Sequence, residues 1–263
     1  MPNIDRLSVV TAMILLAYAL TAFINFPTQL LNIQLPGFLF TVRINFITFI
    51  SLVVTVLAAA GSDWLISDHP HYGDENRVQH WLLPAFTALV IGVPLDALRV
   101  SPSWWAVFGL GGLLLVGVFI SEYIAVDQSD IRYAIARVSL SAVSLALLLV
   151  LLIAVRGAGL RLYLVLAAVI PAIGLVSAKT LHLRLGGWNI AWAVGIALVI
   201  VQITAGFFYL PLKPLQFGLV LLGITYGLIS LAGNIEEKRA PQTMWIEPLI
   251  VFSIFSFIAI ISK

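Results

Sequence analysis

Long apolar stretches constrain this chain more than any other feature, because nine of them occupy most of its 263 residues. A helix needs about 20 mostly apolar residues to cross about 30 Å of hydrocarbon. Stretches of this kind lie at 7–26, 44–61, 81–98, 104–126, 131–155, 160–178, 189–210, 214–233 and 244–262. The sequence therefore predicts an all-α, polytopic transmembrane helix bundle of about nine spans. We expect 1–263 to form a single membrane domain with no soluble domain.

The composition leads to the same prediction. Hydrophobic residues make up 61% of the chain and charged residues 10%, against about 45–50% and about 25% in soluble domains. Solid apolar blocks such as 145–155 lack the period-two alternation of transmembrane strands, so only helices can satisfy their backbone. The net charge is only +2 and there is no cysteine, so we expect neither nucleic-acid binding nor thiolate chemistry.

Tryptophan and basic residues indicate where the spans end and how they are oriented. All seven tryptophans lie at or near predicted span ends, as in an interfacial aromatic belt. Alternating sides place eight basic residues on the N-terminal side and six on the other. The eight are Arg6, Arg77, Arg132, Arg137, Lys179, Arg184, Lys238 and Arg239. The excess favours a cytoplasmic N-terminus in a multi-pass membrane protein.

The connection 62–80 is the most polar segment and carries the candidate metal ligands. His69 and His71 flank a proline, and Asp74 and His80 follow them. Imidazole together with carboxylate suits zinc, manganese or iron, and such an ion could generate a nucleophilic water. The alternative is a solvated loop that is polar because it faces water. His-x-His alone is a weak pattern, so the solvated loop is the preferred interpretation.

Ionisable residues near span ends form a second group of candidates. Asp96 and Arg99 are three positions apart, which suits an ion pair on one helix face or a terminal anchor. Glu247 lies near the start of the ninth span, on the same predicted side as Lys179 and His182. These three residues would line a polar cavity or a proton path if they met. Otherwise they are end residues whose charges reach water, the interpretation we prefer.

Polar residues deep in the predicted spans are few. Gln202 is the candidate in the seventh span, and no Asp, Glu, Lys or Arg lies near a span centre. Ion-coupled pumps usually need a charged relay at that depth, so the sequence argues against a pump or an ion channel. Glu122 belongs to a short charged connection that we expect to be a solvated turn.

Two further patterns bear on packing. Small residues recur at a spacing of four, as at Gly223 and Gly227, and allow helices to approach closely within one chain or between chains. The segment 25–40 is too apolar for an ordinary loop and too short for a span. We expect it to be an interfacial or re-entrant segment, or a hydrophobic connector among the headgroups.

A family resemblance is carried by the polar loop and the third span. Its residues are His-Pro at 69–70, Gln-His-Trp-Leu-Leu-Pro at 79–84 and Gly-Val-Pro-Leu at 92–95. In these runs the chain resembles a family of uncharacterised bacterial polytopic membrane proteins, classed as a domain of unknown function. The rest of the chain resembles it only in hydropathy. The resemblance implies a multi-pass protein of the bacterial inner membrane, and it implies no activity and no site residues.

Three functions are open on these observations. The small-residue faces and scarcity of buried charge favour a non-enzymatic subunit or scaffold of a membrane complex, with other membrane subunits or a homo-oligomer as partners beside the lipid bilayer. A Trp-x-x-Pro repeated at 81–84 and 245–248 favours a transporter or binder of a lipid or other apolar small molecule. The His and carboxylate residues of 68–80 would suit a metal-dependent membrane enzyme. A metal ion is the one cofactor that the residues suggest.

Overall fold

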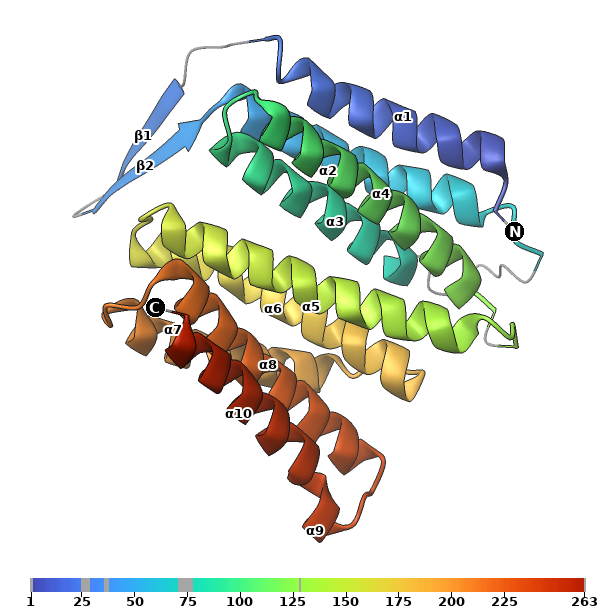
Figure 1. The fold of residues 1–263 in the computed structure, drawn as a ribbon, viewed down its shortest axis with the longest axis vertical. Coiled ribbons are helices and arrows are strands. Elements are labelled where there is room, and N and C mark those ends of the chain that lie inside the picture. Colours follow the sequence, from blue (N-terminus) through green and yellow to red (C-terminus); the bar gives the residue numbers. More distant parts are fainter. Residues whose placement is uncertain (1, 25–28, 36–37, 71–77, 128, 263) are drawn as a thin grey trace. The chain divides into compact units, whose positions relative to one another are not determined.

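The computed structural model describes residues 2–24, 29–35, 38–70, 78–127 and 129–262 (Figure 1). Two short strands follow the first helix: β1 Gln29–Leu35 and β2 Phe38–Ile44. The helices of the described chain are α1 Ile4–Leu20, α2 Phe46–Ile66, α3 Val78–Ala97, α4 Pro102–Ala125, α5 Tyr133–Gly157, α6 Leu162–Leu185, α7 Ile190–Phe208, α8 Pro214–Glu236, α9 Pro241–Met244 and α10 Ile246–Ile261.

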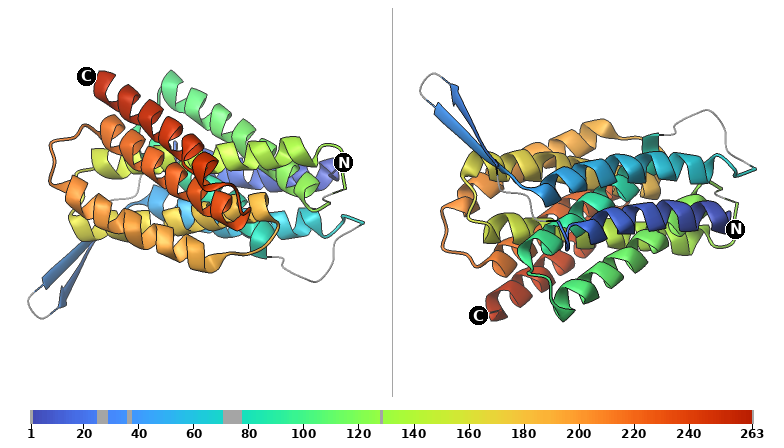
Figure 2. Two further views of the ribbon diagram at one scale, coloured as in Figure 1. Left: turned by 90° about the horizontal axis from the view of Figure 1, so that it is seen from below. Right: turned by 90° about the horizontal axis from the view of Figure 1, so that it is seen from above.

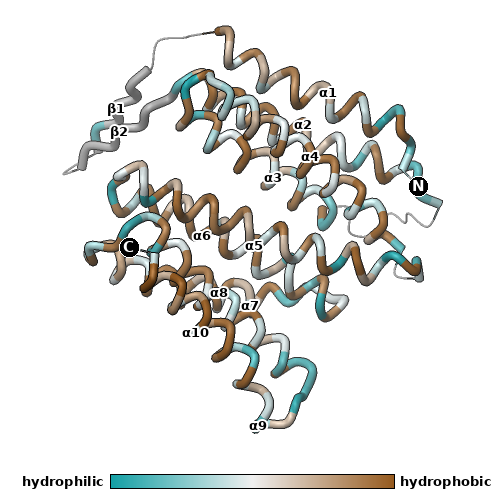
Figure 3. Tube along the Cα trace, viewed as in Figure 1, coloured by the Kyte–Doolittle hydropathy of each residue, from teal (hydrophilic) through white to brown (hydrophobic). Residues whose placement is uncertain are grey.

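Eight helical segments of the described chain are long and apolar enough to cross a membrane: α2 to α8, and α9 with α10 as one segment. Figure 3 shows hydrophobic residues along the helices and hydrophilic residues gathered near many of their ends. The predicted all-α polytopic bundle is therefore confirmed, and the chain is a multi-pass membrane protein. The remaining predicted span, 7–26, corresponds to α1, which is only 17 residues long, a rise of about 26 Å.

The two strands form an antiparallel pair that the sequence analysis did not predict. Gln29 pairs with Ile44 and Leu35 with Phe38, so the segment expected to be interfacial or re-entrant is a β-hairpin over 29–44. Polar residues lie two positions apart at Asn32 and Gln34 in β1 and at Thr41 and Arg43 in β2, a spacing that is typical of strands.

The chain divides into two compact units, Met1–Tyr133 and Ala134–Lys263, which we name the N-terminal and the C-terminal unit. In the N-terminal unit, α1, α2, α3 and α4 surround an apolar core. The Tyr18 hydroxyl of α1 donates a hydrogen bond to the Ala88 carbonyl of α3 at 2.5 Å. Gly61 of α2 lies so close to Val10 that a Cβ atom would be 2.3 Å from its Cγ1. Glycine is required there by the close approach of α1.

The C-terminal unit contains α5 to α10, and its α8 and α10 lie side by side (Figures 1 and 2). A Cβ atom at Gly223 of α8 would lie 2.9 Å from the Cβ of Phe255 in α10, and one at Gly227 would lie 3.6 Å from the Pro248 carbonyl oxygen. This small-residue pair thus supports packing within the chain. The first residues of α8 contact α5, since a Cβ at Gly218 would be 2.8 Å from Ile153.

Candidate functional site

The C-terminal unit contains a cavity of about 460 Å³ between α5, α6, α8 and the start of α10. We name it the basic cavity. Its apolar wall is formed by Val138, Ala142, Leu145 and Ile229. Its polar side chains are Arg137, Ser141, Thr180, Arg184, Tyr226, Ser230, Glu237, Arg239 and Glu247. Several of them lie at helix ends: the start of α5, the last turn of α6, the residue after α8 and the start of α10.

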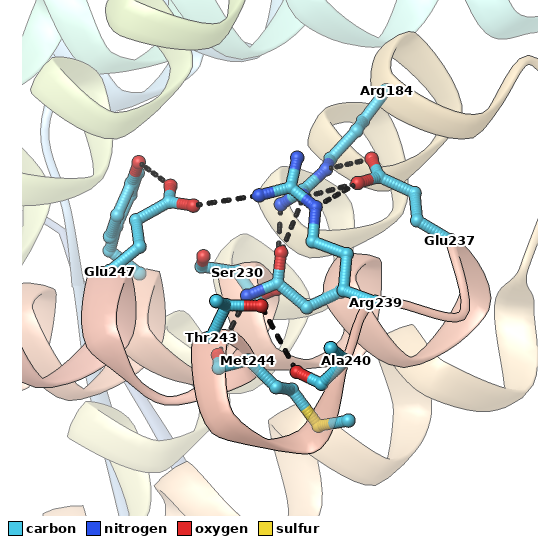
Figure 4. Close-up of polar contacts among 10 residues, drawn as sticks. Arg184, Ser230, Glu237, Arg239, Ala240, Thr243, Met244 and Glu247 are labelled. Carbon is cyan, nitrogen blue, oxygen red and sulfur yellow. Dashed lines mark hydrogen bonds and ion pairs between the residues drawn. The ribbon is translucent and has the colours of Figure 1, made fainter.

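Arg184 is the centre of the polar network on this cavity (Figure 4). Its Nε donates to Oε1 of Glu237 at 2.6 Å, and its Nη2 donates to Oε2 at 3.0 Å. The same Nη2 donates to Oδ1 of Asn234 at 2.7 Å. Asn234 is fully buried and in turn donates through Nδ2 to the Met244 carbonyl at 2.8 Å. Arg184 therefore connects the last turn of α6 to the end of α8 and, through Asn234, to α9.

Arg239 and Glu247 extend the network toward α10 (Figure 4). Arg239 donates through Nε to Oε2 of Glu237 at 2.7 Å, and its Nη1 lies 4.0 Å from Oε2 of Glu247. The Tyr226 hydroxyl of α8 donates to Oε1 of Glu247 at 2.9 Å. Glu237 is thus the stronger partner of Arg239, and the Glu247 side chain stays 40% exposed.

The charges of the basic cavity leave a positive excess. The hydrogen bond from Arg184 is the largest cause that lowers the pKa of Glu237 below its ordinary value, so this carboxylate is ionised at neutral pH. Arg137 lines the cavity from α5 and is half-buried. It forms no ion pair with any residue that the structure describes. One arginine is therefore available to an anionic group in the cavity.

The residues predicted around Glu247 are only partly brought together. Glu247 lines the basic cavity, but its partners are Tyr226 and Arg239 rather than Lys179 or His182. Lys179 is buried in α6 with 1% of its surface exposed, and the His182 ring stacks on Trp188 with centroids 4.8 Å apart.

The α6 residues that line the cavity are Thr180 and Arg184, which lie one and five positions after Lys179. The alternation of the predicted spans places Arg184 on the same side as Glu247, but no sequence pattern distinguishes it from the other basic residues there. The available signal was the number of charged residues on this side, including Glu237 and Arg239.

The other predicted polar candidates lie elsewhere. Asp96, in the last turn of α3, accepts a hydrogen bond from Nδ2 of Asn45 at 2.7 Å. Arg99 lies beyond the end of α3 at Ala97 and lines a second cavity of about 330 Å³ with Asp96 and Asn45, in the N-terminal unit. Gln202 is exposed on α7 and does not line the basic cavity.

The candidate metal loop is described only in part. His71 and Asp74 lie outside the described residues, and the described residues contain no group of three or more metal-binding side chains. His69 packs edge-on against Tyr123 of α4 with ring centroids 4.8 Å apart. The metal site therefore stays a prediction.

Glu122 is the clearest correction to the sequence analysis. We expected a solvated turn, but Glu122 lies inside α4 and is fully buried. Its Oε2 lies 2.8 Å from Nδ1 of His80, and His80 is 7% exposed. His80, expected in the loop, belongs to the first turn of α3, and its carbonyl accepts a hydrogen bond from Ser62 of α2 at 2.8 Å. The pair therefore joins α3 and α4 inside the N-terminal unit.

Comparison with known proteins gives a family and no activity. No curated protein matches the chain, and no solved structure matches it. A family model described as "Protein of unknown function (DUF5656)" matches residues 26–262. This match covers every strand and every helix after α1, including all residues of the basic cavity. The chain therefore belongs to the DUF5656 family of uncharacterised proteins.

Proposed function

We propose that this membrane protein binds an amphipathic membrane molecule, a lipid or a lipid-linked compound, whose polar headgroup occupies the basic cavity. The cavity supports the proposal because its lining combines apolar side chains with an arginine that no described residue neutralises. Ligand sites of this kind combine apolar walls with a few placed polar groups. Arginine binds phosphate or carboxylate with two parallel N–H donors.

The depth of the cavity also fits such a ligand. Its α5 wall runs from Arg137 to Leu145, which corresponds to about 12 Å along a helix. Charged side chains lie at the helix ends, and apolar side chains such as Ala142 and Leu145 lie deeper in the span. A headgroup with the first part of an acyl chain has the same order of polarity along its length.

Native mass spectrometry of the full chain tests the proposal. The protein would be extracted from its membrane in mild detergent, and the mass of each retained molecule would be measured. We expect the wild type to retain lipid and Arg137→Gln to retain about tenfold less, since one charge-assisted contact is lost. Arg137 forms no described ion pair, so the substitution breaks none of the ion pairs that the structure describes.

Arg161→Gln is the matched control for this experiment. Arg161 is exposed, precedes the first turn of α6 and does not line the basic cavity. Equal lipid retention by the wild type, Arg137→Gln and Arg161→Gln contradicts the proposal. The role of this protein as a subunit of a membrane complex stays a prediction. The same mass spectra test that role, because a particle that contains other chains in fixed stoichiometry would support it.

A further inference from the structure

We propose that the basic cavity selects a zwitterionic headgroup, in which a phosphate and an ammonium group are joined by a short linker. The inference rests on the proposed function, because it names the class of headgroup that the cavity takes. It follows from the presence of an available arginine and a partly exposed carboxylate in one cavity.

The cationic part of the cavity is Arg137. Arg184 and Arg239 line the same cavity, but both donate to Glu237 at 2.6–3.0 Å. Glu237 therefore has two arginine partners, and Arg137 has none within the described chain. Arg239 also keeps Nη donors, but its charge is paired with Glu237, whereas the charge of Arg137 has no partner within the described chain. This difference favours phosphate binding at Arg137.

The anionic part is Glu247. Tyr226 holds its Oε1 at 2.9 Å, and its Oε2 lies 4.0 Å from Nη1 of Arg239, the outer limit of an ion pair. Oε2 therefore retains capacity to accept a hydrogen bond from a ligand. A bare phosphate or a carboxylate ligand would be repelled by this group. An ammonium would neutralise this carboxylate as well as donate a hydrogen bond to it, whereas a hydroxyl would donate a hydrogen bond without neutralising the charge.

A competition between three lipids tests the inference. The full chain would be reconstituted in nanodiscs containing equal amounts of phosphatidylethanolamine, phosphatidylglycerol and phosphatidic acid. The lipid retained after extraction would then be measured by native mass spectrometry. We expect the wild type to retain phosphatidylethanolamine about tenfold over phosphatidylglycerol, and Glu247→Gln to bring the ratio close to one.

The Gln side chain in Glu247→Gln keeps an oxygen that accepts from Tyr226, so the local fold is preserved. Glu236→Gln is the matched control, because Glu236 accepts from Trp192 at 2.6 Å and does not line the cavity. We expect this variant to keep the wild-type ratio.

Other outcomes separate the two proposals. Retention of phosphatidylglycerol or phosphatidic acid at least equal to that of phosphatidylethanolamine overturns the zwitterion inference and leaves lipid binding intact. A ratio that Glu247→Gln does not change also overturns it. Absence of any retained lipid overturns the proposed function itself. Displacement of the retained lipid by millimolar glycerophosphoethanolamine supports the zwitterion inference, because it shows that the headgroup alone binds the cavity.

Discussion

Replacement of Arg184 by glutamine should lower the stability of the C-terminal unit more than any other single arginine change at the basic cavity. Arg184 is 16% exposed and donates twice to Glu237. Glutamine is two bonds shorter, so it cannot reach both Glu237 and Asn234 from the last turn of α6. The substitution therefore removes the connection between α6 and the end of α8.

The cost of this substitution follows from two contributions. Loss of the Arg184 donor leaves Oδ1 of the fully buried Asn234 without that hydrogen bond, which costs about 1–3 kcal/mol. The bidentate pair with Glu237 is partly exposed, so its loss adds only about 1 kcal/mol. A total of about 2–4 kcal/mol corresponds to a decrease of about 4–16 °C in apparent Tm for a protein of this size.

Arg239→Gln provides a matched control, because Arg239 binds the same carboxylate from a more exposed position. Its side chain is 48% exposed, so the expected cost is about 0.2–1 kcal/mol. Both variants would be heated in detergent at one fixed rate, and the remaining folded protein would be measured by size-exclusion chromatography, since membrane proteins often unfold irreversibly. Equal decreases for the two variants would show that net charge, rather than burial and hydrogen-bond geometry, determines the effect.

Three further predictions concern the same network and the buried pair of the N-terminal unit. The pKa of Glu237 lies below its ordinary value of 4.5 because Arg184 donates a hydrogen bond to it. The ionised carboxylate therefore stabilises the fold fully above pH 4.5, and this stabilisation is lost as the pH falls through the lowered pKa. The difference in apparent Tm between wild type and Glu237→Gln should therefore shrink from pH 7 to pH 3, and a constant difference contradicts this. Gly233→Ala would place a Cβ atom 2.7 Å from the Arg184 guanidinium. In a double-mutant cycle, the stability loss of Gly233→Ala should therefore not add to that of Arg184→Gln. Full additivity of the two losses would rule out the contact. His80→Ala removes the imidazole beside the fully buried Glu122 and should lower the free energy of unfolding by about 3–5 kcal/mol. The decrease in apparent Tm measures this loss, and a decrease below about 1 °C argues against the pair.

Hydropathy predicted the helices well but placed several of their ends too early. The second span was predicted to end at residue 61, where polar residues begin, yet α2 continues to Ile66. Ser62 donates to the His80 carbonyl, and Asp63 accepts from Nε1 of Trp81 at 3.2 Å. Contacts with α3 therefore satisfy polar side chains that hydropathy assigns to a loop. The same reasoning explains why α6 continues to Leu185, where Arg184 has partners on α8.

The basic cavity was less predictable than the helices, because its pairs join residues far apart in the chain. Glu247 was a candidate from its position near a span end, and the structure places it in the cavity. Its contact with Tyr226 crosses from α10 to α8, and the contact between Arg184 and Glu237 crosses from α6 to the residue after α8. No local spacing encodes these contacts. For Glu122 the local sequence was misleading, because the neighbouring charged residues suggested a solvated turn. The structure instead buries this carboxylate against His80.

Two arginines of α5 show how an anchoring residue differs from one that is available to a ligand. Arg156, near the end of α5, donates to the carbonyls of Phe208, Leu210 and Leu212 at 2.8–3.3 Å. Its guanidinium also lies 5.6 Å from the centre of the Phe208 ring. These contacts use its donors for the fold, so a ligand there would have to displace protein partners. Arg137, near the start of the same helix, has no described ion pair and lines a cavity. An arginine of this second kind can bind an anion without first breaking the fold, which is why the proposed ligand is placed beside Arg137.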